Sequence, residues 1–161
     1  MSVGTAGALM GTCRGRAKSG VKPQVIAFEL AQSSLLTAGK GGAHRVEDIG
    51  LGFYPRFLDQ SVSSDIPTVD QENGFATCRR IAKEERGFCD GSTGLNVAGA
   101  VELAEEMDPE QRIVTLASDS GLKYLGAIST PYKGVAPQGQ STPSDHLIVG
   151  VGKAVARMSD L

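Results

Sequence analysis

The sequence predicts an α/β fold with a mainly parallel sheet and helices on both faces. Two short apolar runs bounded by turn residues, 25–30 and 113–117, have the composition of buried parallel strands. Three stretches with helical periodicity lie among these runs, and glycine-rich loops precede the first and the last of the three helices. This alternation of strand and helix favours layers of helices packed on a parallel sheet.

The first thirty residues are expected to run from a loop to a helix to a strand. The loop is Gly4–Ala8, and the helix after it ends near Ser19-Gly20, where glycine is a common helix stop. The strand 25–30 follows Pro23. The next thirty residues are irregular and rich in glycine, and a long connection of this kind in a compact domain is usually functional or disordered.

The middle of the chain predicts a strand and two helices. The strand covers 65–69, and the helix 72–86 follows Asp70, a plausible N-cap. A second glycine-rich loop, 87–94, leads into a helix over about 95–107. Its apolar residues recur at helical spacing, so we expect one face of it to be buried.

The end of the chain is expected to differ from the rest. The strand 113–117 closes the α/β part, which we assign to residues 1–130 as one domain. The stretch 131–145 is rich in Pro, Gly, Ser, Thr and Gln and is typical of a linker. Residues 146–158 are apolar enough for a last short element, so 131–161 is treated as a separate, unassigned tail.

Composition excludes several classes of protein. The 161 residues suit one domain, and a formal charge of −2 argues against a strongly basic nucleic-acid binder. No apolar run is long enough to span a membrane, and no secretory signal segment is visible at the start. The three cysteines form no metal pattern or disulfide framework, which fits a reducing cytoplasm. We expect no partner that is a nucleic acid or a membrane.

Three loops are candidate binding sites. The loop Gly4–Ala8 offers backbone N–H groups and a helix dipole to an anion such as phosphate, and Thr5 adds a hydroxyl, although a plain glycine turn is the alternative. In 91–94, Ser92 is either an N-cap or a hydroxyl that points into a pocket. The turn 119–121 follows a buried strand, where ligands bind in parallel sheets, but an ordinary turn is the simpler interpretation.

The remaining reactive residue types give weak indications. His44 and His146 have no cysteine or carboxylate cluster that would make a metal site, and His44 is interpreted as a solvated or loop-ordering residue. The cysteines are interpreted as packing residues. Cys89, beside the second glycine-rich loop, is the one worth testing for reactivity.

The order and spacing of these motifs resemble the cysteine synthase and cystathionine β-synthase family over about residues 1–130. These are fold-type II pyridoxal-phosphate enzymes of the tryptophan-synthase-β-like fold. The segments that carry the resemblance are Val3–Gly11, Val21-Lys22-Pro23, Gly39–Phe53, Glu84-Glu85, Phe88-Cys89, Ser92–Val97 and Asp119–Leu125.

The resemblance implies pyridoxal 5'-phosphate as cofactor and assigns roles to particular residues. Gly4, Thr5, Ala6, Gly7 and Ala8 look like the loop that cradles the cofactor phosphate, with Ala8 where the family often has a second threonine. Ser92 looks like the serine that hydrogen-bonds the pyridine nitrogen. A neutral hydroxyl partner would leave that nitrogen largely unprotonated, which suits β-replacement. Ile49 and Gly50 look like part of a loop near the substrate.

The resemblance also implies what the chain lacks. In the family, the Schiff-base lysine and the asparagine-containing substrate loop precede the phosphate loop, and this chain begins three residues before Gly4. We therefore expect no catalytic residue in this chain. Asp48 replaces a usual glycine beside the cofactor, and Asp90-Gly91 departs from the usual glycine followed by an aliphatic residue.

The expected function is the C-terminal part of a pyridoxal-phosphate-dependent β-replacement enzyme of cysteine biosynthesis, acting on O-acetylserine or serine with a sulfur nucleophile. Alone, such a part is not expected to be catalytic. An N-terminal half would complete it and allow an amino-acid substrate to bind, and the expected partners are a second copy of the chain, as a homodimer, or a complementing chain. The alternatives are a non-catalytic cofactor-binding or partner module and a non-functional remnant of such an enzyme.

Overall fold

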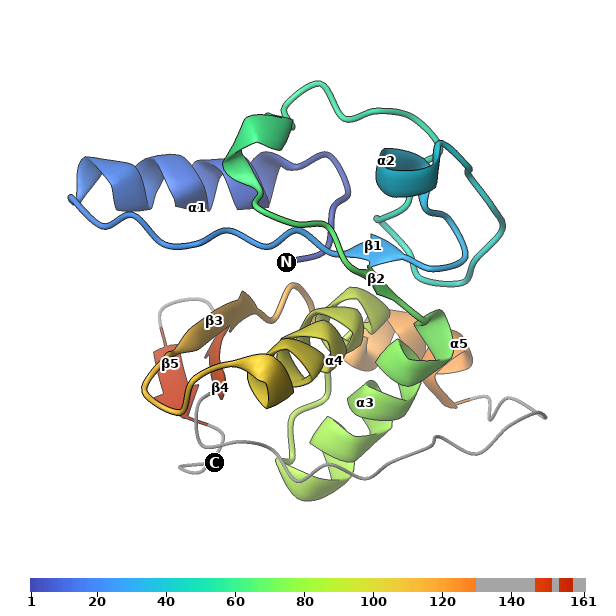
Figure 1. Cartoon of the computed structure of the whole chain (residues 1–161). Coiled ribbons are helices and arrows are strands. Elements are labelled where there is room, and N and C mark those ends of the chain that lie inside the picture. Colours follow the sequence, from blue (N-terminus) through green and yellow to red (C-terminus); the bar gives the residue numbers. More distant parts are fainter. Residues whose placement is uncertain (130–146, 152–153, 158–161) are drawn as a thin grey trace.

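The computed structural model describes residues 1–129, 147–151 and 154–157, in two lobes that meet at the short strands β1 and β2 (Figure 1). One lobe is formed by residues up to β2 and contains the helices α1 (Gly7–Lys18) and α2 (Leu35–Ala38) and the 3-10 turn η1 (Gln60–Val62). The other lobe contains the remaining helices and strands. This arrangement confirms the α/β class and the early loop-helix order.

The strands of the first sheet are much shorter than the sequence predicts. β1 (Glu29–Leu30) pairs in parallel with β2 (Thr68–Val69), with Glu29 opposite Thr68 and Leu30 opposite Val69. Residues 25–28 and 65–67 run beside each other with only single bridges, such as Ile26 with Asp65. The apolar pattern therefore identified the right segments but overestimated how far they form a regular ladder.

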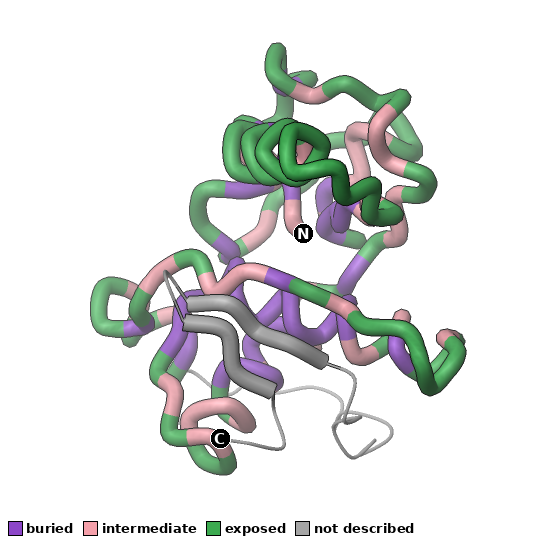
Figure 2. Tube along the Cα trace, turned by 90° about the vertical axis from the view of Figure 1, so that its left-hand side faces the viewer, coloured by how far each residue is buried: buried purple, intermediate pink, exposed green. Residues whose placement is uncertain are grey.

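The second lobe is built on two packed helices, α3 (Gln71–Glu84) and α4 (Gly91–Glu106). Asp70 caps α3 as predicted, because its carboxylate accepts hydrogen bonds from two amides of the first turn. α4 is capped by Asp90 and not by Ser92, which corrects one of the two interpretations of that serine. Figure 2 shows that buried positions concentrate along this central part of the molecule.

Small residues bring α3 and α4 close together. A Cβ built on Gly94 would lie 2.2 Å from the backbone oxygen of Gly74 and 2.3 Å from Cys78 Sγ. The main core cluster joins α3 and α4 to the first lobe, since it contains Phe75 and Cys78 of α3, Leu95 of α4, and Phe28 and Leu30. The apolar stripe predicted for α4 is thus buried on almost all sides over its first turns.

One carboxylate at the α3–α4 contact is expected to make the stability of the fold depend on pH. Partial burial raises the pKa of Glu102 above its ordinary value, although Asn73 Nδ2 donates to its Oε1 over 2.7 Å. The folded state binds this proton more readily than the unfolded state, so the stabilisation is present at low pH and is lost as pH rises through the raised pKa. We expect the wild type to lose stability relative to Glu102→Gln as the pH rises between about pH 4 and 7. Urea unfolding of both proteins at each pH measures this difference.

The second sheet has the order β3-β4-β5. β3 (Ile113–Leu116) matches the predicted strand 113–117, and β4 (Leu147–Val151) pairs with it in parallel. β5 (Ala154–Arg157) pairs antiparallel with β4. The segment predicted as a linker, 131–145, and His146 lie outside the described residues.

Short helices follow β3. The turn predicted at Asp119-Ser120-Gly121 leads directly into the 3-10 turn η2 (Gly121–Tyr124), where Ser120 Oγ accepts from the amide of Leu122, and then into α5 (Leu125–Ser129). Within the described part of the chain, no helix is long and apolar enough to cross a membrane.

Candidate cofactor site

The loop before α1 forms an open cradle of backbone amides. Ala6 has φ 64°, a left-handed conformation, and turns the chain so that α1 begins at Gly7. Among the described residues, no acceptor lies within hydrogen-bond distance of the amides of Thr5, Ala6 and Ala8. The amide of Gly7 makes a weak contact of 3.4 Å with Thr5 Oγ1. Unpaired amides at the start of a twelve-residue helix are an anion-binding arrangement.

The cradle is held in place by a second loop. A Cβ on Gly4 would lie 2.2 Å from the backbone oxygen of Asp48, so glycine is required where these two loops touch. The amide of Gly50 donates to the backbone oxygen of Val3 over 3.4 Å. Asp48 itself has φ 65°, which aspartate tolerates better than most residues and which explains why a glycine is usual at such a position.

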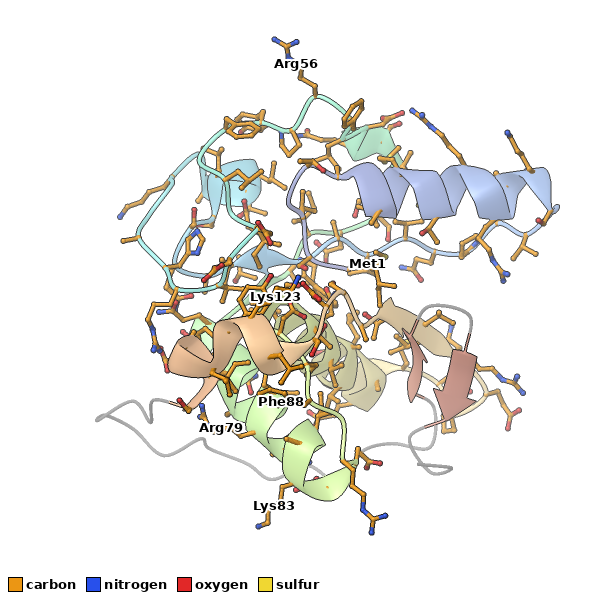
Figure 3. The ribbon with its side chains drawn as sticks, turned by 180° about the vertical axis from the view of Figure 1, so that it is seen from behind. Met1, Arg56, Arg79, Lys83, Phe88 and Lys123 are labelled. Carbon is orange, nitrogen blue, oxygen red and sulfur yellow. The ribbon has the colours of Figure 1, made fainter. Side chains whose placement is uncertain are left out.

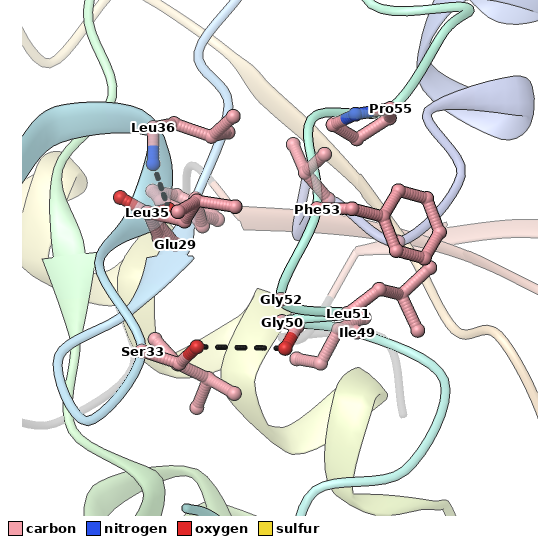
Figure 4. A pocket seen from close by; sticks show the side chains of 14 residues that line it. Glu29, Ser33, Leu35, Leu36, Ile49, Gly50, Leu51, Gly52, Phe53 and Pro55 are labelled. Atoms are coloured by element: carbon pink, nitrogen blue, oxygen red, sulfur yellow. Dashed lines mark hydrogen bonds between the residues drawn. The ribbon is translucent and has the colours of Figure 1, made fainter. Parts of the chain in front are cut away.

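Gly4 lines a small pocket, and Figure 4 shows this pocket from close by. The predicted substrate-near residues Ile49 and Gly50 line it, together with apolar side chains that include Phe28 and Phe53. The cavity holds about 20 Å³, room for about one water molecule. Phe53, at the edge of the pocket, is 56% exposed.

Two hydrogen-bonded polar groups shape this pocket. Glu29 is buried, and its carboxylate accepts from the amides of Leu36 and Thr37, which fixes the start of α2. Ser33 Oγ donates to the backbone oxygen of Gly50 over 3.4 Å. His44 Nε2 contacts the same oxygen at 3.1 Å, which agrees with its predicted role in ordering the loop. The roles of Glu29 and Ser33 were not predicted, because no local pattern in the sequence shows which backbone groups their side chains reach.

Ser92 lies on α4, close to the chain segment that enters the cradle. The amide of Ser2 donates to Asn96 Oδ1, and Asn96 Nδ2 donates to the backbone oxygen of Leu116. Ser92 and Asn96 are four residues apart and share one face of the helix. Ser92 is only 5% exposed and does not line the pocket beside Gly4.

The turn after β3 contributes an ion pair at the junction of the two lobes. Lys123 Nζ lies 2.5 Å from Asp119 Oδ2, and Lys123 is seen between the lobes in Figure 3. The hydrogen bond from Lys123 lowers the pKa of Asp119, and Asp119 raises the pKa of Lys123. The negative charge of Asp48 acts on Lys123 in the same direction. This lysine is therefore held in its protonated form.

The cysteines pack as predicted. Cys78 and Cys89 are buried in the main core cluster, and Cys78 Sγ donates to the backbone oxygen of Asp90 over 3.1 Å. The hydrogen bond with Cys89 and burial both raise the pKa of the Cys78 thiol. The suggested reactivity of Cys89 stays a prediction. Within the described residues no group of His, Cys, Asp and Glu side chains could hold a metal ion.

Sequence comparisons identify the relatives of this chain. The family model of pyridoxal-phosphate dependent enzymes matches residues 1–119. The probable cysteine synthase of Bacillus subtilis (strain 168) is 33% identical over 126 residues, 77% of this chain and 40% of that protein. The O-ureido-L-serine synthase of Streptomyces lavendulae is 31% identical over 122 residues, 76% of this chain and 38% of that protein.

The solved structures that resemble this chain are of the same kinds of enzyme. The crystal structure of O-ureido-L-serine synthase superposes with a TM-score of 0.74 at 29% identity and covers 84% of this chain and 43% of that one. The cysteine synthase of Entamoeba histolytica gives a TM-score of 0.74 at 25% identity, over 83% of this chain and 40% of that one. The chain thus spans about two-fifths of the length of these relatives and has the fold of that part of a fold-type II enzyme. Since the family model covers most of the chain, it belongs to the family of pyridoxal-phosphate dependent enzymes, whose cofactor is pyridoxal 5'-phosphate.

Proposed function

We propose that the chain forms the C-terminal part of a β-replacement enzyme of cysteine biosynthesis, which joins O-acetylserine or serine to a sulfur nucleophile. The observation that carries this proposal is the open amide cradle at Gly4–Gly7, at the start of α1. The cysteine synthases among its relatives point to the same chemistry. A cytoplasmic location fits the three free thiols.

The residues of the cradle fit the phosphate group of pyridoxal 5'-phosphate. The amides of Thr5, Ala6 and Ala8 would hold it, with the Thr5 hydroxyl as a further donor. The small pocket beside Gly4, which Ile49 and Gly50 line, adjoins this cradle. When bound, the cofactor supplies the electron-withdrawing ring that labilises bonds of the amino acid.

We place no catalytic residue in this chain. The family resemblance places the Schiff-base lysine before the phosphate loop, and Lys123, which lies after it, is paired with Asp119. The proposal therefore needs an N-terminal segment that supplies the lysine; a complementing chain can provide it, whereas a homodimer adds a subunit contact but no new segment. The amino-acid substrate would bind only in that completed assembly.

The test compares the chain alone with a completed assembly. We expect the purified chain to bind pyridoxine 5'-phosphate, which has no aldehyde, and to show no turnover of O-acetylserine with sulfide. Co-expression with the N-terminal segment of the Bacillus subtilis relative should give a co-purifying pair with activity. Turnover by the chain alone would contradict the proposal. Binding without any active pairing would favour the alternative, a non-catalytic cofactor-binding module.

Ala8 offers a pair of variants that separates binding from folding. Ala8→Asp places a negative charge in the exposed first turn of α1, which has no acidic residue. This charge stabilises the helix by about 0.3–1 kcal/mol but repels phosphate, so we expect loss of pyridoxine 5'-phosphate binding with a slightly higher melting temperature. Ala8→Thr adds a hydroxyl donor and should tighten binding. Isothermal titration calorimetry measures both, and equal affinity in all three proteins would place the phosphate elsewhere.

A further inference from the structure

Asp90 accepts hydrogen bonds from five donors at the start of α4. Its Oδ2 accepts from the amide of Ser92 over 3.1 Å and from Ser92 Oγ over 2.5 Å. Its Oδ1 accepts from the amide of Thr93, from Thr93 Oγ1 by a short contact, and from the amide of Asp119 over 3.3 Å. Asp90 is 5% exposed, so these donors and not water satisfy the carboxylate.

The directions of these hydrogen bonds are fixed by the groups around them. Thr93 Oγ1 accepts from the amide of Ser118 over 2.8 Å, so its own proton is directed to Asp90. Both oxygens of Asp90 accept from N–H groups at the start of α4, and Ser92 Oγ donates to Oδ2. The single hydroxyl proton of Ser92 therefore lies on the hydrogen bond to Asp90.

A serine hydroxyl has one proton. When that proton is donated in a hydrogen bond to a carboxylate, the oxygen can act toward another partner only as an acceptor. This reverses the expectation drawn from a neutral serine that donates to a pyridine nitrogen and leaves that nitrogen unprotonated. The reversal comes from Asp90, which stands where the relatives' pattern has glycine.

We propose that Asp90 makes Ser92 a hydrogen-bond acceptor, so that this chain selects the protonated form of the pyridine ring bound beside it. The inference rests on the proposed function, because the ring must bind near Ser92. Asp90 then acts as a positioning residue: it does not touch the ring and acts through the hydroxyl of Ser92. A protonated ring withdraws electrons more strongly, which would widen the bond-breaking chemistry open to the completed enzyme.

The test uses pyridoxine 5'-phosphate labelled with ¹⁵N in the ring, bound to the full chain and observed by NMR. We expect the ring nitrogen in the wild type to keep its proton to a pH at which the free ligand has lost it. Asp90→Asn keeps the capping hydrogen bond from the amide of Thr93. Its oxygen would stay with Thr93 and its NH2 group would face Ser92, so the backbone amide of Ser92 loses its acceptor and the serine hydroxyl proton is free for the ring. We expect the proton affinity of the ring nitrogen to fall by about tenfold or more in this variant.

Two controls keep the outcome specific. Asp70→Asn makes the same change at the exposed cap of α3 and should leave the ring nitrogen as in the wild type. In the ligand-free protein, a slowly exchanging hydroxyl proton should be present and should disappear in Ser92→Ala. An absent hydroxyl signal, or the same nitrogen state in the wild type and Asp90→Asn, would overturn the inference. A ligand that fails to bind while the hydroxyl signal is present would instead count against the proposed function.

Discussion

Gly94→Ala should lower the free energy of unfolding by about 3 kcal/mol. The added methyl group would lie 2.2 Å from the backbone oxygen of Gly74 and 2.3 Å from Cys78 Sγ, so α3 and α4 must separate to accept it. Backbone cannot rotate away as a flexible side chain can. A loss of this size is a large part of the stability of a domain of this length, and urea unfolding followed by circular dichroism measures it.

Gly11→Ala is the matched control, and we expect it to raise the free energy of unfolding where Gly94→Ala lowers it. Nothing lies within 4 Å of a Cβ at Gly11, which is an exposed position inside α1. Replacing a helical glycine by alanine there should stabilise the protein by about 0.5–1 kcal/mol. A loss below about 1 kcal/mol in Gly94→Ala would show that the two helices slide apart easily.

Asp90→Ala should cost about 3 kcal/mol, more than loss of a helix cap alone. The variant removes the cap of α4 and leaves the hydroxyls of Ser92 and Thr93 without their buried acceptor. Since the amide of Asp119 loses its partner as well, the connection after β3 should loosen. Thermal and urea unfolding give the free energy, and hydrogen exchange at Asp119 reports the connection.

Asp70→Ala provides the comparison for that result. Asp70 caps α3 in the same way through Glu72 and Asn73, but it is exposed to solvent. Water can replace its carboxylate, so we expect a loss of about 1 kcal/mol. Equal losses in the two variants would mean that the hydroxyl network of Asp90 contributes nothing beyond the cap.

The sequence predicts helices here better than strands. α3 has a cap at Asp70 and an apolar stripe with helical spacing, and both are local features that the folded chain keeps. The strand predicted over 25–30 shortens to Glu29–Leu30, because ladder length depends on a partner about forty residues away, which local pattern does not reveal. The two strands after residue 146 were expected only as one short element, since they depend on pairing of β4 with β3 and of β5 with β4.

In the candidate site too, local features could be predicted from the sequence and contacts between distant segments could not. The cradle at Gly4–Ala8 was predictable because glycine before a helix is a local pattern. The contact of Gly4 with Asp48 and the bond from Ser2 to Asn96 join segments far apart in the sequence, and no local pattern encodes them. The N-cap at position 90 was missed because Ser92 is also a good capping residue; in the structure the helix begins at Gly91, and Asp90 accepts from the amides of Ser92 and Thr93.

The hydrogen bond between Ser2 and Asn96 closes a loop of 94 residues, and this has a consequence for folding kinetics. Contacts of long sequence separation form late, because the entropy of loop closure must be overcome first. The α3–α4 pair is local in sequence and can form early. The amide of Ser2 should therefore gain protection from hydrogen exchange after the amides of α4 during refolding, and the cradle should open at a lower free energy than global unfolding.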